Sequence, residues 1–390
     1  MTLFGARFFI FIVLATTAPG QSQVAEKSAQ SAKADPHERV MVTDPKSGIA
    51  GAELFQIGPD GRLKDSDADW VMPLDHPDWR AAAAADHMKP EDPVLGVYYR
   101  GKSWALPWWI MKNHHVANLI LEGRPVVIAF CEVCSSAIAR DPVMDGRRLT
   151  FHLAGIYNGS ILLADDQTKS YWTPFTGEAL EGPLKGSKLK QLEVIQCRWR
   201  DWLELHPQTL VASAREDLRT GHGSRHSPGR PGNPFVRFLL KPLDERLGEA
   251  DAVLGIARAD IAKAYPLAAL DALTDSTVVV LNEKFGKDDI VILHQRGSWL
   301  TTVFDRKFRA KTLRFNADPD GRIVDSNYHA HWNYEGEALD GPVAGAKLRS
   351  IPSHVEEWYI WAAFHPATSI YERPVNNAPA TDPTSPSSAP

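Results

Sequence analysis

The sequence lacks the short motifs that mark several common enzyme classes. It has no phosphate-binding loop, no Rossmann glycine fingerprint and no HExxH. Gly-x-Ser-x-Gly is absent too, so the sequence gives no support for a hydrolase. A net charge of −5, without a basic stripe, argues against a nucleic-acid partner. After the N-terminal segment no stretch is apolar enough to span a bilayer, so we expect no integral membrane segment once a signal is removed.

The N-terminus has the pattern of a secretory signal. Arg7 precedes an apolar run over residues 8–15, and the small residues Ala18 and Gly20 permit cleavage before Gln21. The run is shorter than the roughly 20 residues that a membrane helix needs. We expect an extracytoplasmic protein, periplasmic or secreted. The alternative is an N-terminal anchor that is not cleaved.

Cysteine is scarce: Cys131, Cys134 and Cys197 are the only three in 390 residues. Outside the cytosol paired thiols oxidise unless a metal or a reductant holds them. Cys197 lies just before a stretch with helical character, and we expect it to be a buried small hydrophobe.

A fixed spacing of 159 residues links two halves of the chain. Val-Leu-Gly at 94–96 recurs at 253–255, where 253 − 94 = 159, and Trp202 recurs as Trp361. Such self-similarity predicts repeated units. The fold class is therefore α+β, with two tandem, homologous β-rich lobes, each with a short N-proximal helix and a C-terminal helix. The first copy reads Phe-Cys-Glu-Val-Cys-Ser at 130–135 and the second Leu-His-Gln-Arg-Gly-Ser at 293–298, so one lobe alone keeps the thiols.

The predicted organisation follows from composition and from this repeat. Its parts are a signal peptide (1–20), a disordered segment (21–38), a leader (39–89), lobe one with the thiols (90–212), a linker (213–249), a degenerate lobe two (250–372) and a disordered tail (373–390). We expect the two lobes to pack against each other, with lobe two as the stabilising partner.

Local signals predict the elements of each lobe. In lobe one we expect a hairpin of 94–99 with 103–106, a helix over 108–121 that begins after Pro107, strands at 126–130, 136–139 and 149–153 with a turn at Asp145-Gly146, and a helix over 199–206. Lobe two should repeat this order, with a helix after Pro266 and strands at 278–281 and 290–293.

Cys131 and Cys134 have the spacing of a chelating or redox-active pair. They follow a predicted strand and precede a predicted return strand, which favours a tight turn with backbone N–H groups aimed at thiolates over the helix N-terminus of thioredoxin-like sites. His114 and Asn118 are four residues apart, on one face of the predicted helix. The prediction is that His114 tunes the thiolate and Asn118 orients the imidazole.

Three functions remain open for these residues. The leading hypothesis is thiol–disulfide redox activity, as in a thiol-dependent oxidoreductase, with Cys131, Cys134, His114 and Asn118 as catalytic residues. The second is a soft-metal binding protein in which Cys131, Cys134, His114 and His115 hold a copper, iron or zinc ion. The third is an interaction module with a structural disulfide. His294 is the residue of lobe two that could reach across.

The pattern resembles the domain-of-unknown-function family 3179. The resemblance is carried by Leu106-Pro107, His114, Asn118, the 131–137 segment, and the stretch from Trp172 to Gly186. It implies exported, two-lobed proteins, and selenocysteine in some members implies redox chemistry if it falls in the motif. The chain departs from the family pattern in three places. His115 stands where the family has an acidic residue, Glu132 where it has Pro, and Ser135 where it has Gly.

Overall fold

The computed structural model describes residues 49–55, 72–214, 232–258 and 261–373. All of them belong to one compact unit, Val42–Pro390. The predicted signal peptide, the 21–38 segment and almost all of the predicted tail lie outside the described residues, as do parts of the leader and of the linker.

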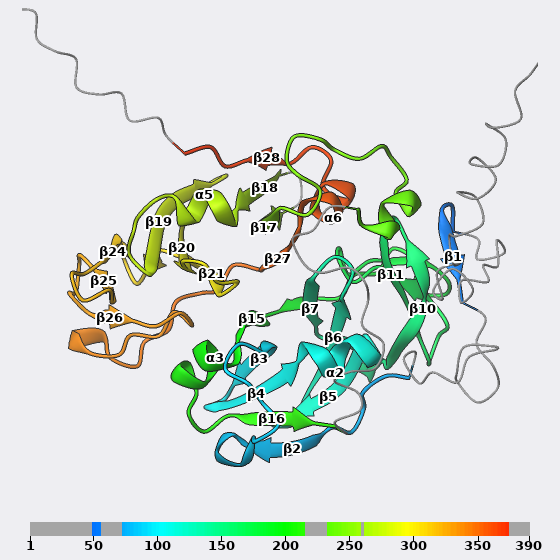
Figure 1. The fold of residues 1–390 in the computed structure, drawn as a ribbon, viewed down its shortest axis with the longest axis horizontal. Helices are drawn as coiled ribbons and strands as arrows, with labels where there is room; N and C mark the ends of the chain where they lie inside the picture. Colours follow the sequence, from blue (N-terminus) through cyan, green and yellow to red (C-terminus); the bar gives the residue numbers. More distant parts are fainter. Residues whose placement is uncertain (1–48, 56–71, 215–231, 259–260, 374–390) are drawn as a thin grey trace, which may run out of the picture. The chain divides into compact units, whose positions relative to one another are not determined.

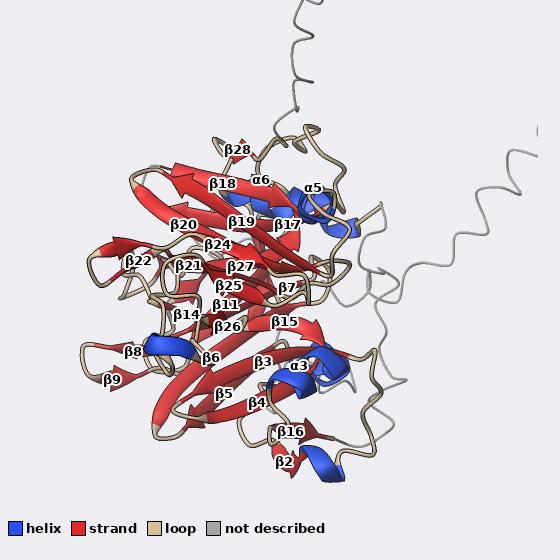
Figure 2. Ribbon diagram, turned by 90° about the vertical axis from the view of Figure 1, so that its left-hand side faces the viewer, coloured by secondary structure: helices blue, strands red, loops and turns tan. Residues whose placement is uncertain are grey.

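Strands dominate the described part of the chain (Figure 2), and the predicted β-rich α+β class is confirmed. The helices of this part are α2 (Trp108–His114), α3 (Trp199–Leu205), α5 (Leu267–Asp271) and α6 (Trp358–Phe364), with 3-10 turns η2 (Ala82–Ala84), η3 (Pro234–Phe238) and η4 (Gly341–Val343). Within the described ranges, no helix is long and apolar enough to cross a membrane.

The first half of the chain forms three larger sheets, drawn in blue to green in Figure 1. One has the order β1-β10-β11-β12-β13 (Ala52–Leu54, Phe151–Tyr157, Ser160–Asp165, Tyr171–Trp172, Ala179–Glu181). The second is β14-β7-β6-β5 (Gln191–Leu192, Ser136–Arg140, Arg124–Cys131, Val116–Leu121). The third is β15-β3-β4-β16-β2 (Ile195–Arg198, Pro93–Tyr99, Lys102–Pro107, Leu210–Ser213, Asp78–Ala81), and β8 (Val143–Met144) pairs with β9 (Arg147–Arg148).

The second half, drawn in yellow-green to red, carries one four-stranded sheet and three sheets of two or three strands within the described residues. They are β27-β17-β18-β28 (Ser353–Glu357, Ala252–Arg258, Ile261–Pro266, Ser369–Ile370), β19-β20-β21 (Val278–Phe285, Asp288–Gln295, Thr301–Asp305), β24-β25-β26 (Phe315–Ala317, Ile323–Asp325, His331–Trp332) and β22-β23 (Lys307–Phe308, Lys311–Thr312).

The prediction of a helix over 108–121 is wrong for the second half of that segment. Helix α2 ends at His114, and His115 takes the left-handed conformation with φ 59°. Residues 116–121 form strand β5, which pairs antiparallel with β6. The sequence Val-Ala-Asn-Leu-Ile-Leu has a helical spacing of apolar residues, but its pairing with a β-branched neighbour strand decides the outcome. His114 and Asn118 therefore do not share a helical face.

The other predicted elements are confirmed, with shifted ends. The hairpin is β3 with β4, the two strands around the cysteines are β6 and β7, and the predicted C-terminal helix is α3. Asp145 and Gly146 both have positive φ (49° and 75°), as a two-residue hairpin turn of this type requires. The strand predicted at 149–153 begins at Phe151, and helix α5 follows Pro266 directly.

The two halves contain matching aromatic contacts. Gly96 lies against the ring of Trp202, where an added Cβ would be 2.3 Å from a ring carbon, and Gly255 lies in the same way against Trp361, at 2.1 Å. Both indoles are fully buried. Each donates its N–H to a threonine hydroxyl seven residues later, at 3.0 Å and 2.9 Å. Both glycines leave room for a tryptophan to pack flat on a strand.

Direct hydrogen bonds link segment 90–212 to segment 250–372. Gln196 Nε2 donates to the carbonyl of Val355 (2.6 Å), and Gln191 Nε2 donates to the carbonyl of Ser353 (3.2 Å). Strand β7 packs beside β27, which brings the end of the β6–β7 hairpin close to the start of α6. This junction contains the two cysteines.

Candidate thiol site

Cys131 and Cys134 lie in the turn that joins β6 to β7. Cys131 is the last residue of β6 and pairs with Ser136, the first residue of β7. Ser135 has φ 53°, and its N–H donates to the carbonyl of Glu132 at 3.3 Å. Glycine adopts this left-handed conformation at the lowest cost. The backbone conformation of Ser135 therefore explains why the family pattern has Gly at this position. The predicted return strand and tight turn are present.

Both sulfurs are buried, and in this structure both are free thiols. Cys131 is 2% exposed and Cys134 is fully covered. The Cys134 sulfur forms hydrogen bonds with the hydroxyls of Ser136 (3.1 Å) and Ser160 (3.7 Å). Ser160 begins β11 and enters from a different hairpin.

The surroundings of Cys131 favour its thiolate. Burial opposes ionisation, but hydrogen bonds from the Cys134 thiol and the Ser160 hydroxyl, and from the backbone N–H groups of Cys134 and Val133, outweigh it and lower the pKa of Cys131. Hydrogen bonds to the charged form are the usual way in which a buried acid is made stronger. Cys131 is therefore the better nucleophile of the pair.

Cys134 has the opposite character. Burial raises its pKa well above the usual value, and the hydrogen bond it donates to Cys131 and the charges of Cys131 and Glu356 act in the same direction, against a smaller effect of Ser136. Of the two thiols, Cys131 is therefore the easier to ionise. An ionised sulfur beside a protonated one is the state in which a dithiol begins thiol–disulfide exchange.

Residues distant in the sequence hold the turn in place. The N–H of Glu357 donates to the carbonyl of Cys134 (3.2 Å), and Ser135 Oγ donates to Glu357 Oε1 (3.1 Å). Asn233 Nδ2 donates to the carbonyl of Val133 (2.7 Å). The β6–β7 turn is therefore fixed from the second half of the chain and from the segment between the halves.

Tyr359 of α6 borders the thiols. Its hydroxyl donates to the carbonyl of Gly159 (3.1 Å), next to Ser160. Burial raises the pKa of Tyr359, and the nearby charges of Cys134 and Cys131 add to this. The phenol therefore stays neutral beside the thiol pair.

Glu356 contributes a buried carboxyl group to the same region. It is fully buried, and its Oε1 lies 3.4 Å from Nε2 of His354. Burial raises the pKa of Glu356, while His354 opposes the rise.

The two predicted histidines lie at the end of α2. His114 Nδ1 forms a hydrogen bond with the carbonyl of Met72 (2.9 Å). His115 Nδ1 forms one with the carbonyl of Phe130 (3.2 Å), the residue before Cys131. Burial lowers the pKa of His115, partly offset by Glu132. His115, more than His114, is thus the imidazole that the structure brings toward the thiol hairpin.

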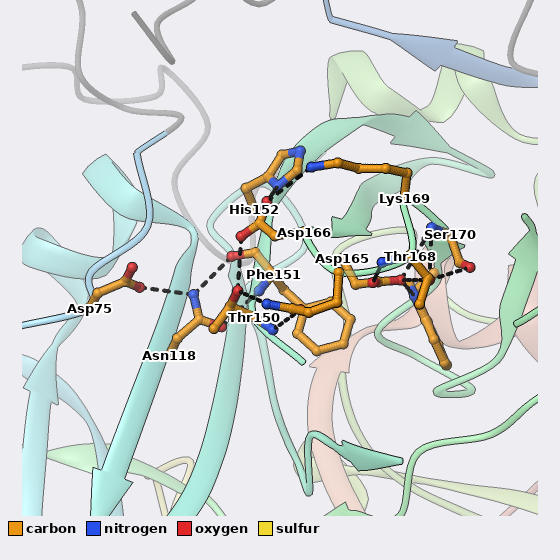
Figure 3. A network of polar contacts seen from close by, with 12 residues as sticks. Asp75, Asn118, Thr150, Phe151, His152, Asp165, Asp166, Thr168, Lys169 and Ser170 are labelled. Atoms are coloured by element: carbon orange, nitrogen blue, oxygen red, sulfur yellow. Dashed lines mark hydrogen bonds and ion pairs between the residues drawn. The ribbon is translucent and has the colours of Figure 1, made fainter. Parts of the chain in front are cut away.

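Asn118 has a different set of partners from those predicted. Its Nδ2 donates to Asp75 Oδ1 (2.8 Å) and to the carbonyl of Phe151 (2.9 Å), and its Oδ1 accepts the N–H of Phe151 (2.9 Å), as Figure 3 shows. It pairs with Val127, four residues or about 13 Å along β6 from Cys131.

The second half repeats this arrangement without thiols. Asn282 exchanges the same two hydrogen bonds with the backbone of Phe315, at 2.7 Å and 3.0 Å. Asn118 is therefore explained by a structural role, in which it fixes the neighbouring strand.

No group of three or more His, Cys, Asp or Glu side chains is placed to hold a metal ion in the described ranges. His294 is fully buried and is hydrogen-bonded to Thr301 (2.8 Å) and Asp271 (3.0 Å), within its own half. Cys197 is 3% exposed in an apolar cluster, which confirms the prediction of a buried small hydrophobe.

Sequence reasoning missed Ser160, Glu356 and Tyr359. The signals available were an adjacent pair of acidic residues, Glu356-Glu357, directly before a buried helix, and the Asn158-Gly159 turn, which places Ser160 at a hairpin tip. Neither signal shows that these three residues lie near the thiols.

A protein-family model described as "Protein of unknown function (DUF3179)" matches residues 69–368, more than half of the chain. The chain belongs to the DUF3179 family. The match contains the thiol turn, Ser160 and Glu356. No curated protein and no solved structure matches the chain. The family model describes no function, so membership in the family does not assign a chemistry to the thiol site.

Proposed function

We propose that the chain is a thiol–disulfide redox protein in which Cys131 and Cys134 cycle between dithiol and disulfide. The observation that carries the proposal is the asymmetry of the buried pair: its polar surroundings lower the pKa of Cys131, while burial raises the pKa of Cys134. Two neighbouring thiols with separated pKa values are what nucleophilic attack and subsequent ring closure require.

The proposed cycle uses a disulfide as the electron acceptor. The Cys131 thiolate attacks one substrate sulfur, the substrate S–S bond breaks, and the first substrate thiolate leaves. Cys134 then loses its proton, and its sulfur attacks Cys131, which expels the second substrate thiolate. The Cys131–Cys134 bond forms, and two electrons have passed from the dithiol to the substrate. A dithiol reductant returns the pair to its starting state by the same exchange.

The proposal assigns Ser160 to the stabilisation of the Cys131 thiolate and the contacts of Asn233 and Glu357 to the geometry of the turn. Since Cys131 is 2% exposed, its sulfur is reached only when the turn opens, and this favours small disulfides over those of folded proteins.

The proposal extends to architecture. The matching contacts of Gly96 with Trp202 and of Gly255 with Trp361 support two homologous tandem lobes, at 90–212 and 250–372. So do the matching clamps of Asn118 and Asn282. We assign the chemistry to the first lobe and a supporting role to the second.

The location of the protein is also part of the proposal. The Arg7 and 8–15 pattern supports export to an oxidising compartment, where a dithiol can encounter disulfides. A fusion of residues 1–20 to a reporter that is active only after export tests it. The reporter stays inactive if the pattern is not a signal.

The redox proposal is tested by equilibrating a Cys197→Ser protein with dithiol–disulfide buffers of graded potential and counting free thiols by mass spectrometry. We expect a two-electron transition between dithiol and Cys131–Cys134 disulfide at a potential above about −300 mV, since structural disulfides lie below that value. Cys134→Ser is the control and should show no intramolecular bond. A pair that stays reduced in every buffer, or stays oxidised below about −300 mV, would overturn the proposal.

A further inference from the structure

A cavity of about 460 Å³ lies beside β5, the end strand of the β14-β7-β6-β5 sheet. Its other walls come from the chain around Asp75 and around Arg148. Its volume is within the range of about 300–1,000 Å³ that is typical of small-molecule sites. Asn118, which also lines it, pairs with Val127, about 13 Å along β6 from Cys131. The cavity is therefore separate from the thiol site.

Two opposite charges line this cavity. Arg148 contributes a guanidinium whose Nη2 donates to the carbonyl of Asn118 (3.3 Å) and whose buried Nε has no hydrogen-bond partner in the described part of the chain. Asp75 contributes a carboxylate whose Oδ1 accepts from Asn118 Nδ2 (2.8 Å), as Figure 3 shows. Within the described ranges neither side chain forms an ion pair. The protein thus leaves both charges to be matched by a ligand, and a few convergent polar groups in a cavity are typical of a binding site.

The positions of the two charges suit a short zwitterion. Both groups contact the same residue, Asn118, so the gap between them is one asparagine plus a hydrogen bond of about 3 Å at each end. The ammonium and carboxylate of an α-amino acid, with a hydrogen bond at each end, span a comparable gap. A ligand with a single charge would leave either Asp75 or Arg148 without a partner.

The remaining wall of the cavity is apolar. Ile120 is 59% exposed there, whereas the other residues of β5 are buried. Pro77 and Trp79 are half-buried and line the same cavity. Covering these three side chains removes apolar surface from water, which favours a ligand that has an aliphatic or aromatic side chain.

We propose that this cavity binds a free α-amino acid with an apolar side chain. The ligand carboxylate pairs with Arg148, the ammonium pairs with Asp75, and the side chain packs against Trp79 and Ile120. Bidentate contact with a carboxylate is the geometry for which a guanidinium is suited. This binding site is independent of the redox function proposed above.

Isothermal titration of the protein at neutral pH with three related compounds tests the proposal. L-Leucine carries both charges, L-leucinamide lacks the carboxylate, and 4-methylpentanoate lacks the ammonium. We expect saturable binding of leucine, and binding of each analogue that is weaker by about tenfold or more, as for loss of a hydrogen bond to a charged group. This comparison needs no variant, so it does not depend on whether a substituted chain folds.

Two variants assign the charges. Arg148→Gln should weaken leucine binding to about the level of leucinamide, and Asp75→Asn should weaken it to about the level of 4-methylpentanoate. Arg147→Gln and Asp78→Asn are the matched controls, because both residues are exposed and neither lines the cavity. Both controls should bind leucine as the parent protein does.

Three results would overturn the proposal: no saturable binding of leucine, binding of either analogue as tight as that of leucine, or parental affinity for leucine in both Arg148→Gln and Asp75→Asn. None of them bears on the thiol pair, so the redox function is tested separately.

Discussion

Replacing Asn118 by alanine tests whether this residue acts on the thiol site, as the sequence suggests, or holds the neighbouring strand, as its hydrogen bonds in the structure indicate. The change removes both hydrogen bonds to the backbone of Phe151, a residue that is fully buried. A buried backbone group without a partner costs about 1–3 kcal/mol, so two such groups give a loss of unfolding free energy of about 2–6 kcal/mol. We expect about 3 kcal/mol, because the neighbouring strand can relax in part.

Urea unfolding followed by tryptophan fluorescence measures this loss, and Asn282→Ala is the matched control in the second half. Asn282 is only half-buried, so water can replace some of its bonds and we expect about 1–2 kcal/mol. The alkylation rate of Cys131 should be unchanged in both variants, because Asn118 lies about 13 Å along the sheet from the thiols.

Two results would refute the reasoning. A loss below about 1 kcal/mol in Asn118→Ala would mean that the bonds to Phe151 carry little energy. A large change in Cys131 reactivity at unchanged stability would mean that Asn118 does act on the thiol site, as the sequence suggested.

Three further predictions concern packing, pH and the thiolate. Gly96→Ala should lower the unfolding free energy by about 2–3 kcal/mol in the same urea assay, because its Cβ would lie 2.3 Å from the Trp202 ring, and full stability would contradict that packing. Burial lowers the pKa of His365 to about 4, so between pH 6.5 and that value the unfolded chain binds a proton that the folded chain does not, and stability falls with falling pH. Between pH 7 and about pH 5 the unfolding free energy should fall less in His365→Gln than in the parent protein, and the two losses should differ by at most about 3 kcal/mol. Equal losses in the two proteins would contradict the lowered pKa of His365. Ser160→Ala should raise the pKa of Cys131 and slow its alkylation at neutral pH about tenfold, whereas an unchanged rate would remove Ser160 from the site.

Much of the local structure could be predicted because its causes are local. Asp145-Gly146 specifies a tight turn, Pro266 marks a helix start, and the β-branched run before Cys131 specifies a strand. Segment 116–121 could not be predicted in this way, because its apolar spacing fits a helix. What makes it a strand is pairing with β6, which is a tertiary effect.

The site was predictable only in part for a related reason. Cys131 and Cys134 carry a spacing motif, so one sequence suffices to find them. Ser160 comes from another hairpin and Glu356 from more than 200 residues away, and neither belongs to a motif. Their role depends on the packing of β7 beside β27, and the periodicity of one chain does not encode which strands of different sheets meet.

The order in which the two thiols react tests the central claim most directly. Both cysteines are buried, Cys131 at 2% and Cys134 at 0% exposure, so limited iodoacetamide labelling is followed over a range of pH by peptide mass spectrometry, because ionisation changes with pH and burial does not. The account predicts that Cys131 is labelled first, and that the preference over Cys134 shrinks as the pH rises and Cys134 also ionises. Labelling of Cys134 first, or equal labelling of both at every pH, would contradict it.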